Sequence, residues 1–167
     1  MTKISEIYHT KSAPVLSFEI FPPKKESGIE SLYQTLDDVD PQKLGVDYIS
    51  VTYGAGGSGD NTMTSDLAQY IQTHFGVTAL HHLTGVNQTP ESLQDSLLKI
   101  GQAGIENILA LRGDVPDKEY VNTNYPYAKD LICDIKKFSE FNIGAAIYPE
   151  GYVDDTVTGI SAVSYTH

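Results

Sequence analysis

The chain of 167 residues has little cysteine and no long hydrophobic run. Cys133 is its one cysteine, which excludes an internal disulfide and a zinc site made of cysteines, and is typical of a reducing cytosol. No apolar tract is long enough to cross a bilayer, and residues 1–5 lack the features of a secretory signal. We therefore expect a cytoplasmic protein that does not enter a membrane.

Positive charge is also scarce. The 22 acidic residues outnumber the 11 basic ones, which gives a formal net charge of −11. Such a charge repels nucleic acid and anionic lipid surfaces, so neither is expected as a partner. A phosphate-bearing ligand would have to be held by local donors, namely backbone N–H groups at the starts of helices and a suitably placed arginine.

Apolar segments that are typical of strands alternate with amphipathic segments at helical spacing. The strand-like segments begin near positions 15, 47, 78, 107 and 143, so a strand–helix unit repeats about every thirty residues. Helices are expected near residues 29–39, 64–75, 90–104 and 127–138. Thr89 and Pro90 give the third of them a capping hydroxyl and a first-turn proline. The fourth would bury Leu131, Ile132, Ile135 and Phe138. The pattern predicts a parallel α/β protein.

Two architectures fit this alternation. One is an open doubly wound sheet, and the other is a (β/α)₈ TIM barrel of which the chain supplies the first five strands and four helices. Gly54, Gly56 and Gly59 match the GxGxxG pattern that favours the open sheet. The acidic residue expected at the end of the next strand is absent, since that strand ends in His82, Leu83 and Thr84. We therefore favour the barrel.

Polar residues stand at the carboxyl end of each predicted strand, which is where the active sites of barrels are built. They are Glu19, Thr52, His82, Arg112 with Asp114, and Tyr148. Glu19 lies between Phe18 and Ile20, so burial is expected to favour its neutral form and make it a proton donor. The alternative is a glutamate satisfied by a neighbouring donor. Asp114 would be kept ionised by Arg112 or by loop amides.

His82 and the segment at Tyr127 are candidates for ligand contacts. His82 and His81 point to opposite faces of a strand, and no carboxylate lies nearby at ligand spacing, so we expect no metal. His82 is interpreted either as a hydrogen-bond donor to a ligand or as a satisfied core histidine. Tyr127 and Ala128 begin a helix whose first N–H groups suit a flavin or nucleotide phosphate.

Six segments, in order between about residue 14 and residue 150, resemble the methylenetetrahydrofolate reductase family. They are residues 17–23 (SFEIFPP), 50–55 (SVTYGA), 82–84 (HLT), 109–116 (LALRGDVP), 127–128 (YA) and 146–150 (AIYPE). The resemblance implies a (β/α)₈ barrel with FAD across the carboxyl ends of the strands. It also implies a ping-pong catalytic cycle, in which NADH or NADPH reduces the flavin and the flavin then reduces 5,10-methylenetetrahydrofolate to 5-methyltetrahydrofolate. This reaction belongs to one-carbon and methionine metabolism.

Through the same resemblance, Glu19 looks like the general acid that assists opening of the folate ring, and Asp114 like a carboxylate beside the flavin and the pterin. The positions that look like FAD contacts are Thr52, Tyr53, Ala55, His82, Leu111, Arg112, Gly113, Asp114, Tyr127, Ala128 and Tyr148. The family also implies a homo-oligomer of the full-length protein.

The resemblance divides the chain in two. Residues 1–150 are expected to form the amino-terminal part of an FAD-binding reductase barrel, and residues 151–167 are a divergent tail. Strands six to eight of such a barrel have no counterpart here, so we expect the chain to be a fragment of a complete enzyme. The alternative is a non-catalytic half-barrel module that binds a flavin or associates with a partner to complete its sheet.

Overall fold

Five parallel strands form one sheet in the computed structural model, which describes residues 2–23, 25–53, 62–114, 124–138 and 140–146. The strands are β1 (Ser17–Ile20), β2 (Tyr48–Val51), β3 (Thr78–Thr84), β4 (Asn107–Leu111) and β5 (Asn142–Ala145). Their order across the sheet is their order along the chain. A doubly wound sheet reverses its strand order at a switch point, whereas a barrel adds each strand beside the previous one. The prediction of part of a (β/α)₈ barrel is therefore confirmed.

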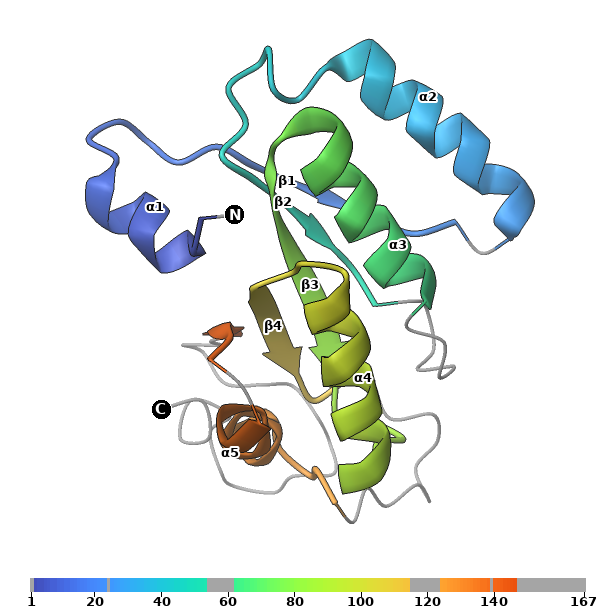
Figure 1. Cartoon of the computed structure of the whole chain (residues 1–167), viewed down its shortest axis with the longest axis vertical. Helices are drawn as coiled ribbons and strands as arrows, with labels where there is room; N and C mark the ends of the chain where they lie inside the picture. The colour runs from blue at the N-terminus through green and yellow to red at the C-terminus, as the bar shows by residue number, and fades with distance from the viewer. Residues whose placement is uncertain (1, 24, 54–61, 115–123, 139, 147–167) are drawn as a thin grey trace.

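Four helices follow the strands, as the sequence predicts. They are α2 (Ile29–Val39), α3 (Thr62–Tyr70) with a π-helical turn (Ile71–Phe75), α4 (Pro90–Gln102) and α5 (Ala128–Phe138). Figure 1 shows α2, α3 and α4 along one side of the sheet and a short helix that was not predicted, α1 (Ile4–Thr10), on the other. No helix in the described part of the chain is long and apolar enough to cross a membrane.

The core lies between the sheet and the covering helices. Side chains alternate between the two faces of a strand, so Ile49 and Val51 of β2 point the same way and are fully buried. Leu67 of α3 and Leu93 of α4 are also fully buried in this core. The helix pattern of the sequence is thereby explained, because the apolar stripe of each helix is the side that packs on the strands.

The start of α4 agrees with the sequence prediction, whereas the end of α5 differs from it. Thr89 caps α4 as expected: its hydroxyl accepts a hydrogen bond from the backbone N–H of Ser92, whose own hydroxyl accepts one from the N–H of Thr89. In α5, Leu131 and Ile135 are buried and Ile132 is partly buried against the core, but Phe138 is 45% exposed. The prediction that Phe138 is buried was wrong: Phe138 is the last residue of α5, one turn beyond Ile135, which is the last buried residue of the helix.

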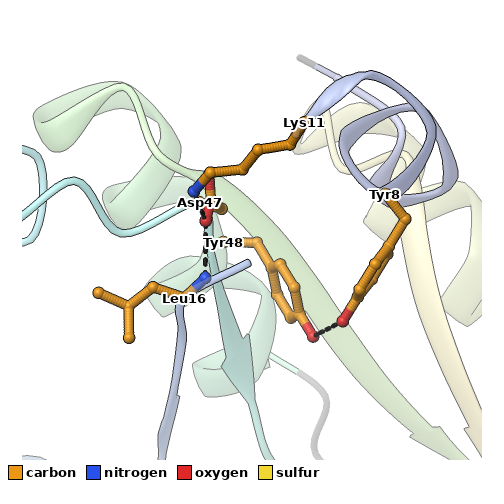
Figure 2. A network of polar contacts seen from close by, with 5 residues as sticks. All are labelled: Tyr8, Lys11, Leu16, Asp47 and Tyr48. Atoms are coloured by element: carbon orange, nitrogen blue, oxygen red, sulfur yellow. Dashed lines mark hydrogen bonds and ion pairs between the residues drawn. The ribbon is translucent and has the colours of Figure 1, made fainter. Parts of the chain in front are cut away.

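Polar contacts attach α1 to the amino ends of the strands (Figure 2). The carboxylate of Asp47 accepts hydrogen bonds from Lys11 and from the backbone N–H of Leu16. These two donors hold the pKa of Asp47 below its usual value. The hydroxyls of Tyr8 and Tyr48 lie 3.3 Å apart. Since α1 buries no side chain, these contacts replace an apolar stripe in fixing its position.

Asn107, at the start of β4, ties the amino-terminal segment to the sheet. Its side chain is fully buried, and its Oδ1 accepts hydrogen bonds from the backbone N–H of Ile4 and from Nδ2 of Asn142. Its Nδ2 donates to the carbonyl oxygens of Thr2 and Ala79. One amide side chain therefore links α1 to three neighbouring strands.

We predict that Asn107→Ala lowers the free energy of unfolding by about 3 kcal/mol, because it leaves buried polar groups without partners. Urea denaturation measures the change, and Gln102→Ala, at an exposed position in α4, is the control. Equal stability of the two variants would contradict the role of Asn107 as a link.

Candidate functional site

The side of the sheet that faces away from α3 and α4 carries polar residues that could act in catalysis or ligand binding. We call this side the inner face. Glu19 of β1 pairs in register with Ser50 of β2, and Ser50 pairs with Leu80 of β3. His82 lies two residues beyond Leu80 and therefore points to the same face. Because all the strands are parallel, this group sits toward the carboxyl ends of β1 to β3.

Glu19 has two polar neighbours on the inner face. Its Oε2 accepts a hydrogen bond of 3.1 Å from the hydroxyl of Ser50 and lies 3.7 Å from Nε2 of His82. Its side chain is 51% exposed, so the expectation that Glu19 is buried was wrong. The reason is the alternation of the strand: Phe18 and Ile20 pack against the core, whereas Glu19 points to the other face.

The adjacent histidines have opposite surroundings, as predicted. His81 is fully buried on the helix side, where its Nε2 lies 3.1 Å from the hydroxyl of Ser65 in α3. This burial lowers the pKa of His81 to about 3. Burial also lowers the pKa of His82, although the charge of Glu19 opposes the shift. Both imidazoles are therefore neutral at pH 7.

On the inner face of β3, two buried polar atoms lack a hydrogen-bond partner among the residues that the structure describes. They are Nε2 of His82 and Oγ1 of Thr84, and both residues are more than nine-tenths buried. His82 and Thr84 are two positions apart, so they share the inner face. A buried polar atom without a partner is costly, and the interpretation of His82 as a contact for a ligand agrees with this geometry better than that of a satisfied core histidine.

The chain beyond the ends of β3 and β4 continues their pairing. The backbone N–H of Gly85 donates to the carbonyl of Leu111, and that of Val86 donates to the carbonyl of Arg112. Nε of Arg112 donates to the carbonyl of Gly113 at 3.3 Å. The predicted residues Leu111 and Arg112 are thus held beside the loop that follows β3.

Gly113 is required by both its backbone and its packing. Its φ of +86° lies in the left-handed region, and a Cβ at this position would lie 2.6 Å from Cγ1 of Val86 and 3.0 Å from Cβ of Thr84. The close approach brings the backbone of the Arg112 to Asp114 segment against β3, the strand that carries His82.

Four further predicted residues lie in the described part of the chain. Thr52 directly follows β2, and its carbonyl accepts a hydrogen bond from the buried hydroxyl of Thr64 in α3, whereas Tyr53 packs against the core. Tyr127 immediately precedes α5, and Ala128 is its first residue. Ala55 and Tyr148 lie outside the described residues.

The segment before α5 packs beside the loop after β3. Nδ2 of Asn124 donates to the carbonyl of Gln88, and a Cβ at Gly85 would lie 2.9 Å from Cβ of Tyr125. Tyr127 and Ala128 are therefore brought toward the same edge of the sheet. Lys129, in the first turn of α5, lies 5.5 Å from the ring centre of Tyr127, which adds positive charge at this edge of an acidic protein.

Ser50 is a member of the group that sequence reasoning did not assign a role. It is 6% exposed and is the hydrogen-bond donor to Glu19. The signal was present in the alternation of polar residues in a buried strand, since Tyr48, Ser50 and Thr52 occupy every second position. Only the register with β1 shows which residue Ser50 faces.

Comparison with known proteins places the chain in a family. A family model described as methylenetetrahydrofolate reductase matches residues 3–163. The chain belongs to the methylenetetrahydrofolate reductase family. The match covers every residue of the candidate site, including Ala55 and Tyr148, so the resemblance given by the short motifs is confirmed over nearly the whole chain.

Individual members of the methylenetetrahydrofolate reductase family are clearly similar. The chain is 37% identical over 150 residues to methylenetetrahydrofolate reductase 1 of Schizosaccharomyces pombe, covering 87% of this chain and 24% of the relative. It is 39% identical over 134 residues to 5,10-methylenetetrahydrofolate reductase of Buchnera aphidicola, covering 80% of this chain and 44% of the relative. A rice protein named probable methylenetetrahydrofolate reductase (NADH) is 37% identical over 146 residues, covering 84% of this chain and 24% of its own. The chain thus spans less than half the length of these relatives.

We predict that Gly113→Ala lowers the free energy of unfolding by about 3 kcal/mol, the sum of a left-handed backbone and an overpacked contact with Val86. Gly45→Ala is the matched control, because its φ is +72° but nothing lies within 4 Å of the added Cβ. We expect that control to lose only about 1 kcal/mol in the same urea titration. An equal loss in both variants would show that the close contact of Gly113 with Val86 does not contribute to the free energy of unfolding.

Proposed function

We propose that this chain forms the amino-terminal part of an FAD-dependent enzyme that reduces 5,10-methylenetetrahydrofolate to 5-methyltetrahydrofolate with NADH or NADPH. The observation that carries the proposal is the inner-face group of Glu19, Ser50 and His82, found in a chain of the methylenetetrahydrofolate reductase family. The name of the rice relative specifies NADH, which supports a nicotinamide reductant.

The residues at this edge of the sheet fit a flavin. The isoalloxazine ring of a flavin has several hydrogen-bonding atoms, and Nε2 of His82 and Oγ1 of Thr84 are buried polar atoms that lack a partner in the described part of the chain. Arg112 and the start of α5 supply positive charge and N–H groups for phosphate. Residues that would hold FAD are Thr52, Tyr53, Ala55, His82, Leu111, Arg112, Gly113, Asp114, Tyr127, Ala128 and Tyr148. Bound FAD supplies the two-electron chemistry that amino-acid side chains lack.

Glu19 is proposed as the general acid of the folate reaction. Its half-exposed side chain stands on the inner face, where a substrate can reach it, and its Oε2 is engaged by Ser50. The carboxyl group would give its proton to the folate nitrogen that leaves the bridging carbon when the five-membered ring opens. Asp114, exposed just beyond β4, would interact electrostatically with the flavin and the pterin.

Membership of the same family also supports a proposal for the division of the chain, the oligomeric state, the localisation and the metabolic role. We propose that residues 1–150 belong to the reductase barrel and residues 151–167 form a separate tail, and that the full-length protein is a cytoplasmic homo-oligomer of one-carbon and methionine metabolism. The net charge of −11 supports a small-molecule substrate in place of nucleic acid or a membrane surface.

We predict that Glu19→Gln, made in the intact gene product, slows reoxidation of the reduced flavin by 5,10-methylenetetrahydrofolate about a hundredfold or more, because the proton donor is lost. Reduction of the flavin by NAD(P)H should stay within about twofold of the wild type, since that step needs no such acid. Stopped-flow absorbance measures the two half-reactions separately. Glu30→Gln, at an exposed position in α2, is the control.

Two results would overturn the proposal. One is purification of the intact gene product without a flavin and without folate-dependent oxidation of NAD(P)H. The other is an unchanged folate half-reaction in Glu19→Gln, which would leave the reductase intact but remove Glu19 from its chemistry.

A second candidate is a non-catalytic half-barrel module that binds a flavin or completes its sheet with a partner. It is favoured by β1 and β5, which each pair with one strand in the described part of the chain, and by Phe21 after β1, which is 69% exposed. Equilibrium sedimentation of the 167-residue chain during a flavin titration tests it. A monomer without flavin affinity would reject the module.

A further inference from the structure

The hydroxyl of Ser50 is the group best placed to fix the carboxyl group of Glu19. The two residues are register partners in β1 and β2, and the donor–acceptor distance is 3.1 Å. Ser50 is 6% exposed and lies in a strand paired on both sides, so its position is set by the sheet. Glu19 is half exposed and has a long side chain, which would sample several rotamers without an anchor.

His82 is the other neighbour of Glu19 and is less suited to be the anchor. Its Nε2 lies 3.7 Å from Oε2 of Glu19, which is beyond hydrogen-bonding distance. Burial lowers the pKa of His82, so the imidazole is neutral and offers no full positive charge to hold a carboxylate. The distance and the protonation state both favour Ser50 as the residue that orients Glu19.

We propose that Ser50 is a positioning residue for the reductase, and that its hydroxyl holds Oε2 of Glu19 so that Oε1 carries the transferred proton toward the substrate. This inference rests on the proposed function of Glu19. In the step concerned, the bond between the folate nitrogen and the bridging carbon breaks, and its electron pair stays on that nitrogen, which receives the proton from Oε1. The lone pair of the other ring nitrogen forms a double bond to the bridging carbon, and the cation so formed would be reduced by hydride from the bound flavin. The resulting carboxylate of Glu19 keeps its hydrogen bond from Ser50. Water restores the proton to Glu19 in the next cycle.

The hydrogen bond affects only the step that needs Glu19. Misplacement of a catalytic group by about 1 Å can cost on the order of a hundredfold in rate. Loss of the anchor leaves Glu19 free to reach the correct position part of the time, so the effect should be smaller than that of removing the carboxyl group. Flavin reduction by NAD(P)H, and flavin reoxidation by a quinone acceptor, do not use the proton of Glu19 and should be unaffected.

The test compares Ser50→Ala with Ser50→Thr and with Ser17→Ala in the intact, flavin-loaded gene product. Ser17 is in β1 on the same face, two residues before Glu19, and is the matched control. We expect Ser50→Ala to slow the folate half-reaction about tenfold or more, while NAD(P)H and quinone half-reactions stay within about twofold. Ser50→Thr, which keeps the hydroxyl, should restore the folate rate to within about threefold of the wild type.

An infrared spectrum gives a readout that does not depend on turnover. The carboxyl band that disappears in Glu19→Gln should shift in Ser50→Ala, where its hydrogen bond is lost, and should stay in place in Ser17→Ala. An unshifted band, or a folate rate in Ser50→Ala equal to that of the wild type, would overturn the positioning role alone. Equal slowing of all three half-reactions would overturn it as well, since that pattern indicates general damage. A wild-type protein without folate turnover would overturn both this inference and the proposed function.

Discussion

Parallel pairing of five consecutive strands, in chain order, is the constraint on which the site depends. It brings the carboxyl ends of β1 to β5 to one edge and turns every second side chain to the inner face. Glu19 and His82 are 63 positions apart in the sequence, yet they meet there across β2. The helices then cover the opposite face, which leaves the inner face for chemistry.

Much of this fold was predictable because periodicity is a local property. The 3.6-residue spacing of Ile29, Leu36 and their neighbours locates α2, and Thr89 with Pro90 marks the start of α4. The short helix α1 was missed because it buries no side chain and is fixed by distant polar partners, as between Lys11 and Asp47. Such contacts leave no periodic trace in the sequence.

The sequence predicts which residue types belong to the candidate site better than it predicts their exposure and hydrogen bonds. His82 and Arg112 stand out as polar residues at the ends of apolar runs, and the structure places both at the carboxyl ends of adjacent strands. The exposure of Glu19 was misjudged because its sequence neighbours are apolar, although they face the core while Glu19 faces the other way. The hydrogen bond from Ser50 to Glu19 depends on the register of β1 and β2, which the sequence alone does not specify.

The central claim is that the carboxyl ends of these strands form one ligand site, and a crystal structure of the intact gene product with bound FAD tests it most directly. The account predicts the isoalloxazine ring on the inner face, with a ring atom within hydrogen-bonding distance of Nε2 of His82. It also predicts the diphosphate near Arg112 and the start of α5. A flavin bound on the helix side of the sheet, or at the amino ends of the strands beside α1, would contradict the account.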